Sequence, residues 1–563
     1  MKKVLLFATL LAPAAGYFYL QQTAAPPPPK LAALMPGGAL LYLEAQDFGR
    51  LLREWDASNV KSDWLASENY EVFSRSNLFT KLSEVYDQYS VAAGFVPGLG
   101  GVREIAGTES ALALYGIRDV EFLYVSRVGD AELVKSQLWT LRNKFEQRQA
   151  GGVVFYLRTD PSSKRTVAFA SAKGLLLVAT RDDLVAQALE LLAGGGNSNV
   201  ASDRWYRDSS AAAANPGELR LVMNLEALVR SDYFRSYWVQ RNAPAVRQYW
   251  AGVADVTRSA GAITESRVFL RQPAAQPARD AAGDRTTSDL LALVPPEAGL
   301  YKASAADSAA AATLIVQKLI SPQIDRTRDW RFAPMAVSSD QHAGSEGDLE
   351  TRIDEPPLPE DAGMGDSEAT VRGMLEKGGA RSVLLLQASS PSAGTFVSLG
   401  SVMVVAGSSD WDRDAVRDAL TAAAGKLWTV SKLGAGWTSS TSGRHTVERM
   451  DGLGTLAFAE RGHLLFLGND ANLLAAALDR ASSTAGGETF SYAAGVRHVR
   501  ERPNFERVMR ALDFGSAGRA APAFFSGNLA SLSRVLSPIE EVRLTEEERE
   551  AQTLQTVVYR LGQ

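Results

Sequence analysis

Alternating apolar and polar residues predict strands and hairpins along much of the chain. ALLYLEA (39–45) reads as a strand, and ALALYGI (111–117) follows as another with a neighbour directly after it. TVAFASA (166–172) and LLLVAT (175–180) form a predicted hairpin around a two-residue Lys-Gly turn. Turns this short join antiparallel strands, so the pattern predicts a largely antiparallel sheet.

Helical periodicity is mixed with these strands. Four apolar residues follow the spacing i, i+4, i+7 and i+11, which places them on one face of a helix; they are Leu78, Leu82, Val85 and Tyr89. A second helix, LVAQALELL (184–192), follows the hairpin. Hairpins and helices that do not alternate strictly are typical of an α+β fold.

One stretch of the chain occurs nearly twice. Residues 166–190 and 455–479 are identical at 10 of 25 positions without a gap, at an offset of 289. Two further pairs follow in the same order along the chain: residues 35–44 with 294–303, and residues 224–230 with 528–534. Collinear matches predict an internal duplication.

The matches predict two related tandem modules, residues 31–270 and 290–563, each a largely antiparallel sheet with packed helices. A polar linker rich in Ala, Pro and Asp, residues 271–289, lies between them. The second module contains an additional acidic segment, residues 339–368, with ten acidic residues against Arg352. Low hydrophobicity with high net charge predicts that this insertion is disordered.

The first 30 residues predict export from the cytoplasm. Lys2 and Lys3 precede residues 4–20, which hold no charge, and a proline run follows at 26–29. This order is typical of a secretory signal peptide, and a retained segment would be an inner-membrane anchor. Both forms place the rest of the chain in the periplasm or cell envelope, with membrane contact only through this segment.

Composition excludes several classes of protein. A chain of 563 residues is too long for a single core. The absence of cysteine excludes disulfides, thiolate nucleophiles and cysteine-ligated metals. A net charge of −5 offers no basic surface for a phosphate backbone, so no nucleic-acid partner is expected.

Short motifs do not predict a catalytic residue, a cofactor site or a metal site. DWDRD (410–414) begins like a calcium loop, but Ala415 and Thr421 stand where that loop needs Gly and Glu. GLGTLA (452–457) leads into a strand, and SNVK (58–61) lacks the companion motifs of penicillin-binding enzymes. All four histidines are expected to be solvated; they are His342, His445, His463 and His498.

An aromatic helical face is the one candidate binding feature. Four aromatic residues fall at i, i+1, i+4 and i+5, with arginines between them; they are Tyr233, Phe234, Tyr237 and Trp238. Aromatic rings combined with cations can stack on a glycan or hold a partner peptide. Packing of this face into the core is the alternative interpretation.

Several segments resemble an uncharacterised family of bacterial exported proteins, known only as a domain of unknown function. They are residues 36–55, 73–82, 174–189 and 224–238. The resemblance implies an extracytoplasmic location and no particular chemistry.

The sequence therefore favours an exported cell-envelope protein that is not an enzyme and that binds or scaffolds an envelope protein or a glycan. An envelope hydrolase or a carrier of an apolar ligand, with a site between the two modules, is the alternative. An enzyme should show convergent polar side chains with perturbed pKa values in one pocket, whereas a binding protein should expose an apolar patch.

The first prediction concerns export. A reporter enzyme that is active only outside the cytoplasm, fused after Lys30, should be active, because two lysines precede the charge-free run at 4–20. Replacing that apolar run with a polar sequence of equal length should abolish the activity. Equal activity with both leaders would contradict the prediction.

Overall fold

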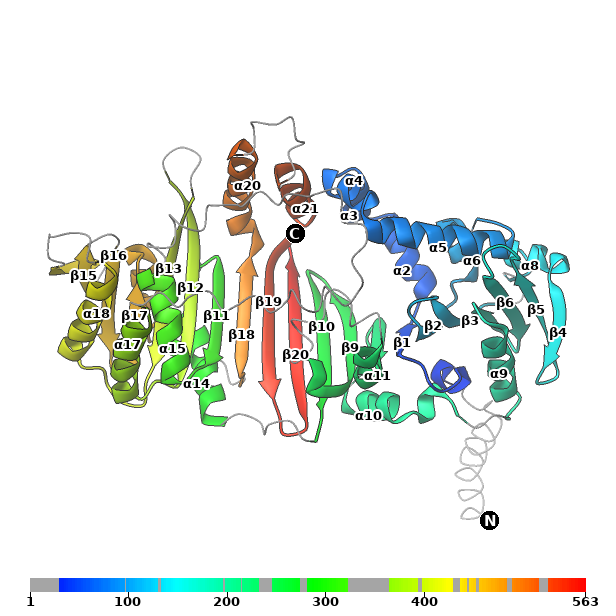
Figure 1. Cartoon of the computed structure of the whole chain (residues 1–563), viewed down its shortest axis with the longest axis horizontal. Coiled ribbons are helices and arrows are strands. Elements are labelled where there is room, and N and C mark those ends of the chain that lie inside the picture. The colour runs from blue at the N-terminus through cyan, green and yellow to red at the C-terminus, as the bar shows by residue number, and fades with distance from the viewer. Residues whose placement is uncertain are drawn as a thin grey trace, which may run out of the picture. The chain divides into compact units, whose positions relative to one another are not determined.

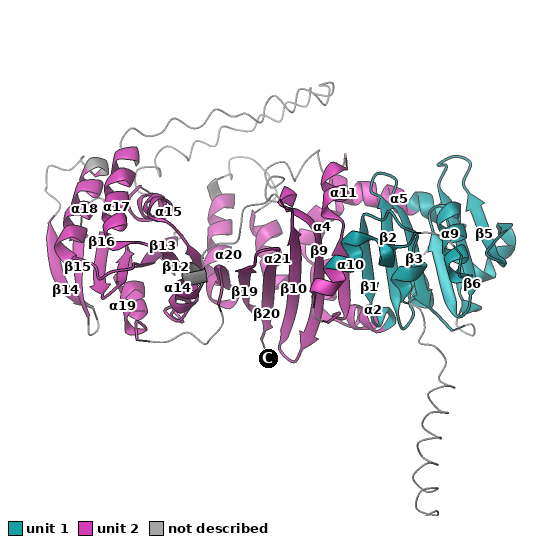
Figure 2. Ribbon diagram, turned by 90° about the horizontal axis from the view of Figure 1, so that it is seen from below, with its two compact units in different colours: residues 1–49, 87–208 teal, residues 50–86, 209–563 magenta. Residues whose placement is uncertain are grey.

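A computed structural model describes most of the chain. It covers residues 30–562 except 97, 130–132, 196–197, 214, 232–245, 274–280, 322–363, 393–396, 429–435, 443–444, 452–454, 483–488 and 516–524. The predicted export segment therefore lies outside the described residues, apart from Lys30. Two compact units divide the chain: residues 1–49 with 87–208, and residues 50–86 with 209–563 (Figure 2).

Unit 1 is built on an antiparallel sheet. Its strands are β1 (Leu41–Ala45), β2 (Ser110–Gly116), β3 (Glu121–Arg127), β4 (Glu146–Ala150), β5 (Val153–Thr159), β6 (Thr166–Ala172) and β7 (Leu175–Ala179). They pair in the order β1–β2–β3–β7–β6–β5–β4, always antiparallel. Its helices are η1 (Leu31–Leu34), α6 (Leu99–Ile105), α8 (Gln137–Thr140), η2 (Arg142–Lys144), α9 (Asp182–Leu192), η3 (Val200–Ser202) and the first part of α10 (Arg204–Ala212).

The hairpin predicted at residues 166–180 is β6 and β7, and α9 follows it. Lys173 and Gly174 form its turn with φ values of 51° and 72°, the left-handed region that a two-residue hairpin requires. Phe169 is fully buried, stacked on Tyr156 at 5.0 Å and edge-on to Phe145 at 5.2 Å. These rings form the centre of the core on that face of the sheet.

Unit 2 carries the rest of the strands. They are β8 (Leu219–Met223), β9 (Tyr249–Ser259), β10 (Ala262–Arg271), β11 (Leu300–Ala305), β12 (Ser382–Pro391), β13 (Val397–Ala406), β14 (Trp437–Ser442), β15 (His445–Asp451), β16 (Thr455–Arg461), β17 (Leu464–Gly468), β18 (Tyr492–Arg497), β19 (Ile539–Glu548) and β20 (Gln552–Leu561). They pair in the order β8–β9–β10–β20–β19–β18–β11–β12–β13–β17–β16–β15–β14, and every pair is antiparallel (Figure 1).

Unit 2 also contains both short and long helices. They are α3 (Asn59–Leu65), α4 (Glu68–Ser74), α11 (Leu225–Arg230), α14 (Ala281–Leu291), α15 (Ser308–Ile315), η4 (Val316–Ile320), α17 (Met364–Gly378), α18 (Arg413–Leu427), α19 (Ala471–Asp479), α20 (His498–Gly515), η7 (Phe525–Leu529) and α21 (Ala530–Val535). The division between the units falls inside α2 (Phe48–Asp56), α5 (Asn77–Ala93) and α10.

Helices cover both faces of the sheet around β13. Met403 and Val405 pack with residues of α15, α17 and α18, whereas Val402 and Val404 pack with residues of α14 and α19. Figure 2 shows these two groups of helices on opposite sides of the strands. Successive side chains of a strand point to opposite faces, so β13 must be apolar at consecutive positions. The predicted α+β class with a largely antiparallel sheet is confirmed.

The same succession of elements occurs in both halves of the chain. The order β1–β2–β3–β7–β6–β5–β4 is repeated by β11–β12–β13–β17–β16–β15–β14, and β8–β9–β10 by β18–β19–β20. Phe458 in β16 is fully buried like Phe169, and the helix α19 follows β17 as α9 follows β7. The recurrence agrees with the sequence repeat. The predicted module boundaries stay a prediction, because the compact units follow packing rather than the repeat.

The two halves differ beside the buried phenylalanine. Tyr156 lies opposite Phe169 in the β5–β6 ladder, and Glu448 lies opposite Phe458 in the β15–β16 ladder. Glu448 is only 6% exposed, and Arg417 of α18 pairs with it at 3.2 Å. An aromatic stack in one half is thus replaced by a paired charge in the other.

Two segments that the sequence predicts to be irregular overlap with helices. Residues 281–289 of the predicted linker belong to α14, where Thr287 and Ser288 are buried because the helix leads the apolar residue Leu290 into the core. The last residues of the acidic insertion, 364–368, form the start of α17, and Ser367 is buried there. The rest of the insertion lies outside the described residues.

The second prediction concerns the two phenylalanines. Phe169→Ala and Phe458→Ala should each destabilise the surrounding sheet by about 3–5 kcal/mol, because each leaves a cavity in a closed core. Amide hydrogen exchange should rise in β6 for the first variant and in β16 for the second. Nearly additive effects are expected in the double variant.

Val154→Ala is the control, because Val154 is 45% exposed and its truncation should change stability by less than about 0.5 kcal/mol. Equal exchange in β6 and β16 for either single variant would show that the two cores are coupled.

Candidate functional site

An apolar row on α5 is partly exposed to solvent. Leu78, Leu82 and Tyr86 are 52%, 53% and 41% exposed, at intervals of four residues along the helix. Residues at this interval form a ridge on one side of a helix, here about 12 Å long at about 1.5 Å per residue. We call these three residues the α5 row. Two of them, Leu78 and Leu82, belong to the helical face that the sequence predicts.

Aromatic packing fixes the helix that carries the row. Phe79 lies edge-on to Phe73 at 5.5 Å and close to Tyr70, while Trp64 of α3 contacts both Tyr70 and Phe73 of α4. The helices α3, α4 and α5 therefore share a small aromatic core of their own. Phe79 turns toward this core, which leaves its neighbours Leu78 and Leu82 to face outward.

Hydrogen bonds attach this helical cluster to the C-terminal helices of unit 2. The Asn69 amide N–H donates to Ser531 Oγ at 2.9 Å, and its side-chain Nδ2 donates to Asn528 Oδ1 at 2.6 Å. Asn69 Oδ1 in turn accepts from Trp64 Nε1 at 3.1 Å. Glu68 pairs with Arg534 at 3.4 Å on the surface. These hydrogen bonds therefore hold α4 against η7 and α21.

A serine–histidine pair lies beside this attachment. Ser533 Oγ of α21 is 2.8 Å from His498 Nε2, and His498 Nδ1 is 3.2 Å from the carbonyl oxygen of Ile539. With Nδ1–H donating to the carbonyl, Nε2 accepts the proton of the hydroxyl, which is the arrangement of a nucleophile and its base. Ser533 is 8% exposed, and the orienting group is a carbonyl rather than a carboxylate.

The expectation that His498 is solvated is wrong, because both of its ring nitrogens have partners and the ring is half-buried. His463 is exposed at the β16–β17 turn, as expected, and His445 contacts Asp479 at 3.0 Å. His342 lies outside the described residues. The partners of His498 are 35 and 41 residues away in the sequence, so no local pattern could reveal them.

The perturbed tyrosines of unit 2 are structural. Burial, and then the Glu541 carboxylate, raise the pKa of Tyr301 to about 12, so its hydroxyl stays protonated and donates to Glu541 at 3.2 Å. Arg560 pairs with the same carboxylate at 3.0 Å, and Arg497 lies 3.7 Å away. The Glu541 carboxylate is therefore matched by one hydroxyl donor and two guanidinium groups within the sheet.

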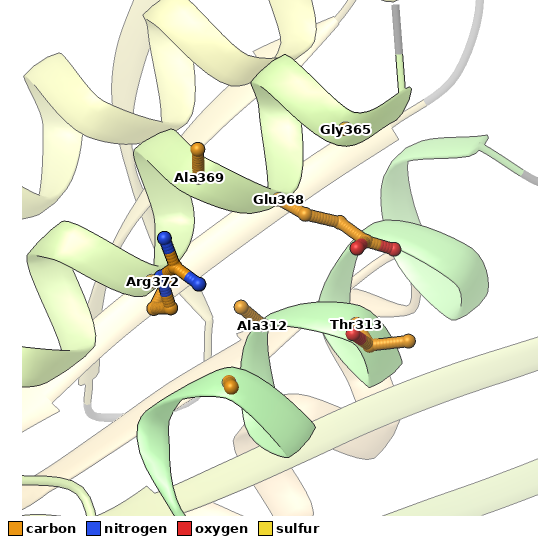
Figure 3. A pocket seen from close by; sticks show the side chains of 7 residues that line it. Ala312, Thr313, Gly365, Glu368, Ala369 and Arg372 are labelled. Atoms are coloured by element: carbon orange, nitrogen blue, oxygen red, sulfur yellow. The ribbon is translucent and has the colours of Figure 1, made fainter. Parts of the chain in front are cut away.

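A hollow between α15 and α17 is shown in Figure 3. It is lined by small side chains, including Ala309, Ala312 and Ala369, and by the charged side chains of Glu368 and Arg372. Arg372 also pairs with Glu376 at 3.7 Å, on the exposed side of α17. The two charged side chains at the hollow, Glu368 and Arg372, both belong to α17.

The aromatic face predicted at Tyr233, Phe234, Tyr237 and Trp238 lies outside the described residues. Two rejected motifs have plain structural roles: Asp412 caps α18, and the hydroxyl of Ser58 accepts from the Lys61 amide at the start of α3. Over the described ranges, groups of three metal-ligating side chains do not occur. Within those same ranges, every helix is too short or too polar to cross a membrane.

Comparison with known proteins adds little. No protein-family model matches the chain, and no curated protein matches it in sequence. Among solved structures, crystal form I of TP0453 is 11% identical and aligns over 44% of this chain and 82% of its own, with a TM-score of 0.23. Crystal form III of TP0453 is 11% identical and aligns over 45% of this chain and 83% of its own, with a TM-score of 0.24. At these TM-scores the likeness supports no argument about fold or function.

Proposed function

We propose that this chain is an exported protein of the bacterial cell envelope that acts by binding rather than by catalysis, and that its partner docks on the α5 row. The observation that carries the proposal is the exposure of Leu78, Leu82 and Tyr86 on consecutive turns of a fixed helix. Export is supported by the leader sequence at 4–20, and the envelope location by the resemblance to exported proteins.

The size of the row suits a modest but specific interaction. Full burial of a large apolar side chain is worth about 1.5–3 kcal/mol, and each residue of the row has roughly half of its surface left to bury. Contributions of about 1 kcal/mol each, with Tyr86 as an aromatic anchor, are typical of an interface centre. The helix is already held by its aromatic core, so little ordering is needed on binding.

The charges around the row favour a protein partner. Residues 50–86 contain five basic and six acidic side chains, so this segment presents no strong field of one sign. An anionic lipid surface or an acidic glycan would be attracted by a basic field. A nearly neutral segment with an apolar ridge instead fits the apolar face of another envelope protein, packed ridge against groove.

The third prediction tests the row. A photo-crosslinking amino acid at Leu82 should yield a discrete adduct in the cell envelope, whereas the same amino acid at Glu84, also exposed on α5, should not. Leu78→Ser should weaken the Leu82 adduct about tenfold or more, equivalent to about 1.4 kcal/mol. The melting temperature should change little, because Leu78 is half exposed.

Adducts of equal intensity at Leu82 and Glu84 would contradict the proposal. A large fall in melting temperature for Leu78→Ser would show instead that the row packs against this chain itself.

An envelope hydrolase is the second candidate, and the 2.8 Å contact between Ser533 Oγ and His498 Nε2 favours it. In such an enzyme, Oγ would attack a substrate carbonyl while Nε2 accepts its proton, and the Ile539 carbonyl would orient the imidazole. The burial of Ser533 and the lack of an acidic third residue weigh against this function.

The fourth prediction separates the two candidates. A fluorophosphonate probe reacts with an activated serine by attack of Oγ on phosphorus and loss of fluoride. The binding proposal expects no labelling of the wild-type protein. Labelling that is lost in Ser533→Ala and kept in Ser531→Ala, whose hydroxyl donates to the Asn528 carbonyl, would establish the hydrolase instead.

A further inference from the structure

The last hairpin of each half is the same hairpin at an offset of 290 residues. β10 spans 262–271 and β20 spans 552–561, so both ends of the strand differ by 290. The registers agree as well: Val256 pairs with Glu265 in the first hairpin, and Glu546 pairs with Gln555 in the second. β10 and β20 are therefore equivalent strands, residue by residue.

These equivalent strands pair with each other. β10 and β20 form an antiparallel ladder that runs without a bulge from Ala262 opposite Arg560 to Leu270 opposite Gln552 (Figure 1). At its middle, Ser266 lies opposite Thr556, and these two residues are themselves equivalent at the offset of 290. A ladder in which equivalent residues meet at the centre has a local two-fold axis there, which is the defining property of an isologous interface.

We propose that β10 and β20 form an isologous interaction surface. The natural partner of each strand is the same strand in a second copy of its module. The chain then corresponds to a dimer of modules whose two subunits are joined by a linker. The proposal does not depend on the proposed binding function, because it concerns only the strand ladder. The linker would then raise the local concentration of the halves without supplying the contacts that hold them.

The side chains of the two strands are compatible with self-pairing. A β10–β10 ladder about the same axis would place Glu265 opposite Arg267, an attractive pair. A β20–β20 ladder would place Gln555 opposite Val557, with no charge on either. Neither arrangement brings like charges together, so each strand can accept a copy of itself as well as its equivalent.

The fifth prediction tests this with the full chain. A specific protease sequence inserted between Ala275 and Gln276 allows the linker to be cut. The cut protein should elute from size exclusion at the volume of the uncut protein, because the ladder, together with the bonds of Asn69 to Asn528 and Ser531, holds the halves together. Separation into two species in native buffer would overturn the proposal.

Cysteine pairs test the register, since the chain contains no native cysteine. After cutting, Ser266→Cys with Thr556→Cys should join the halves by a disulfide, because directly opposed positions lie within disulfide reach. Ser266→Cys with Gln552→Cys is the matched control, since Gln552 faces Leu270, about 13 Å along the strand. Equal linkage by both pairs, or by neither, would overturn the register.

A single cysteine tests self-pairing. Cut Thr556→Cys protein, allowed to exchange halves in mild denaturant and then returned to native buffer, should form disulfide-linked pairs of C-terminal halves, because position 556 would face itself. Gln552→Cys should form none, since position 552 would face 560. Absence of the pairs in Thr556→Cys would refute self-complementarity, even if the cut halves stay together.

Discussion

The cost of leaving the edge of a strand unpaired governs how β10 and β20 are arranged in this protein. A strand with one open side exposes a row of N–H and C=O groups, which are costly to leave unpaired and invite association with another chain. β10 and β20 would be the open edges of their respective halves, and each closes the other. The ladder thereby turns two sheets into one without adding a new element.

Burial on both faces is the second constraint, and it acts on side chains. Strands such as β13 lie between two layers of helices, so their apolar residues cannot alternate with polar ones. The centre of each half still tolerates different chemistry: Tyr156 stacks on Phe169, whereas the corresponding Glu448 is neutralised by Arg417. Removing Arg417 would leave the buried Glu448 carboxylate with only the more distant Arg413, at 3.9 Å, so the loss of this arginine should be costly.

Local patterns in the sequence predict local structure well. The hairpin at 166–180, its turn at Lys173 and the helix after it are all present, because turn residues and periodicity act over a few positions. The antiparallel α+β class follows from the same patterns. Strand order does not follow from local patterns. β7 lies between β3 and β6, and the pattern of its residues does not indicate which strands it pairs with.

The candidate site was predicted only in part. Periodicity identifies the helix that bears Leu78 and Leu82, yet exposure depends on which side the aromatic core occupies, and that is decided by Phe79 meeting Phe73 and Tyr70. The contact of His498 with Ser533 depends on how α20 and α21 pack against each other. The spacing of residues in the sequence does not predict this packing. The predicted aromatic face at 233–238 stays a prediction.

The β10–β20 ladder also has a kinetic consequence. β10 leaves the ribosome long before β20, since 290 residues separate the two strands. At about 5–20 residues per second, synthesis of that interval takes roughly 15–60 s. Contacts this distant in sequence are among the last to form, because the two ends of the intervening segment must first meet. Throughout that interval β10 is an open edge, and its complement on a neighbouring nascent chain would be as good a partner as its own. Crowding of such chains during synthesis would therefore let strand-exchanged dimers form in competition with the monomer.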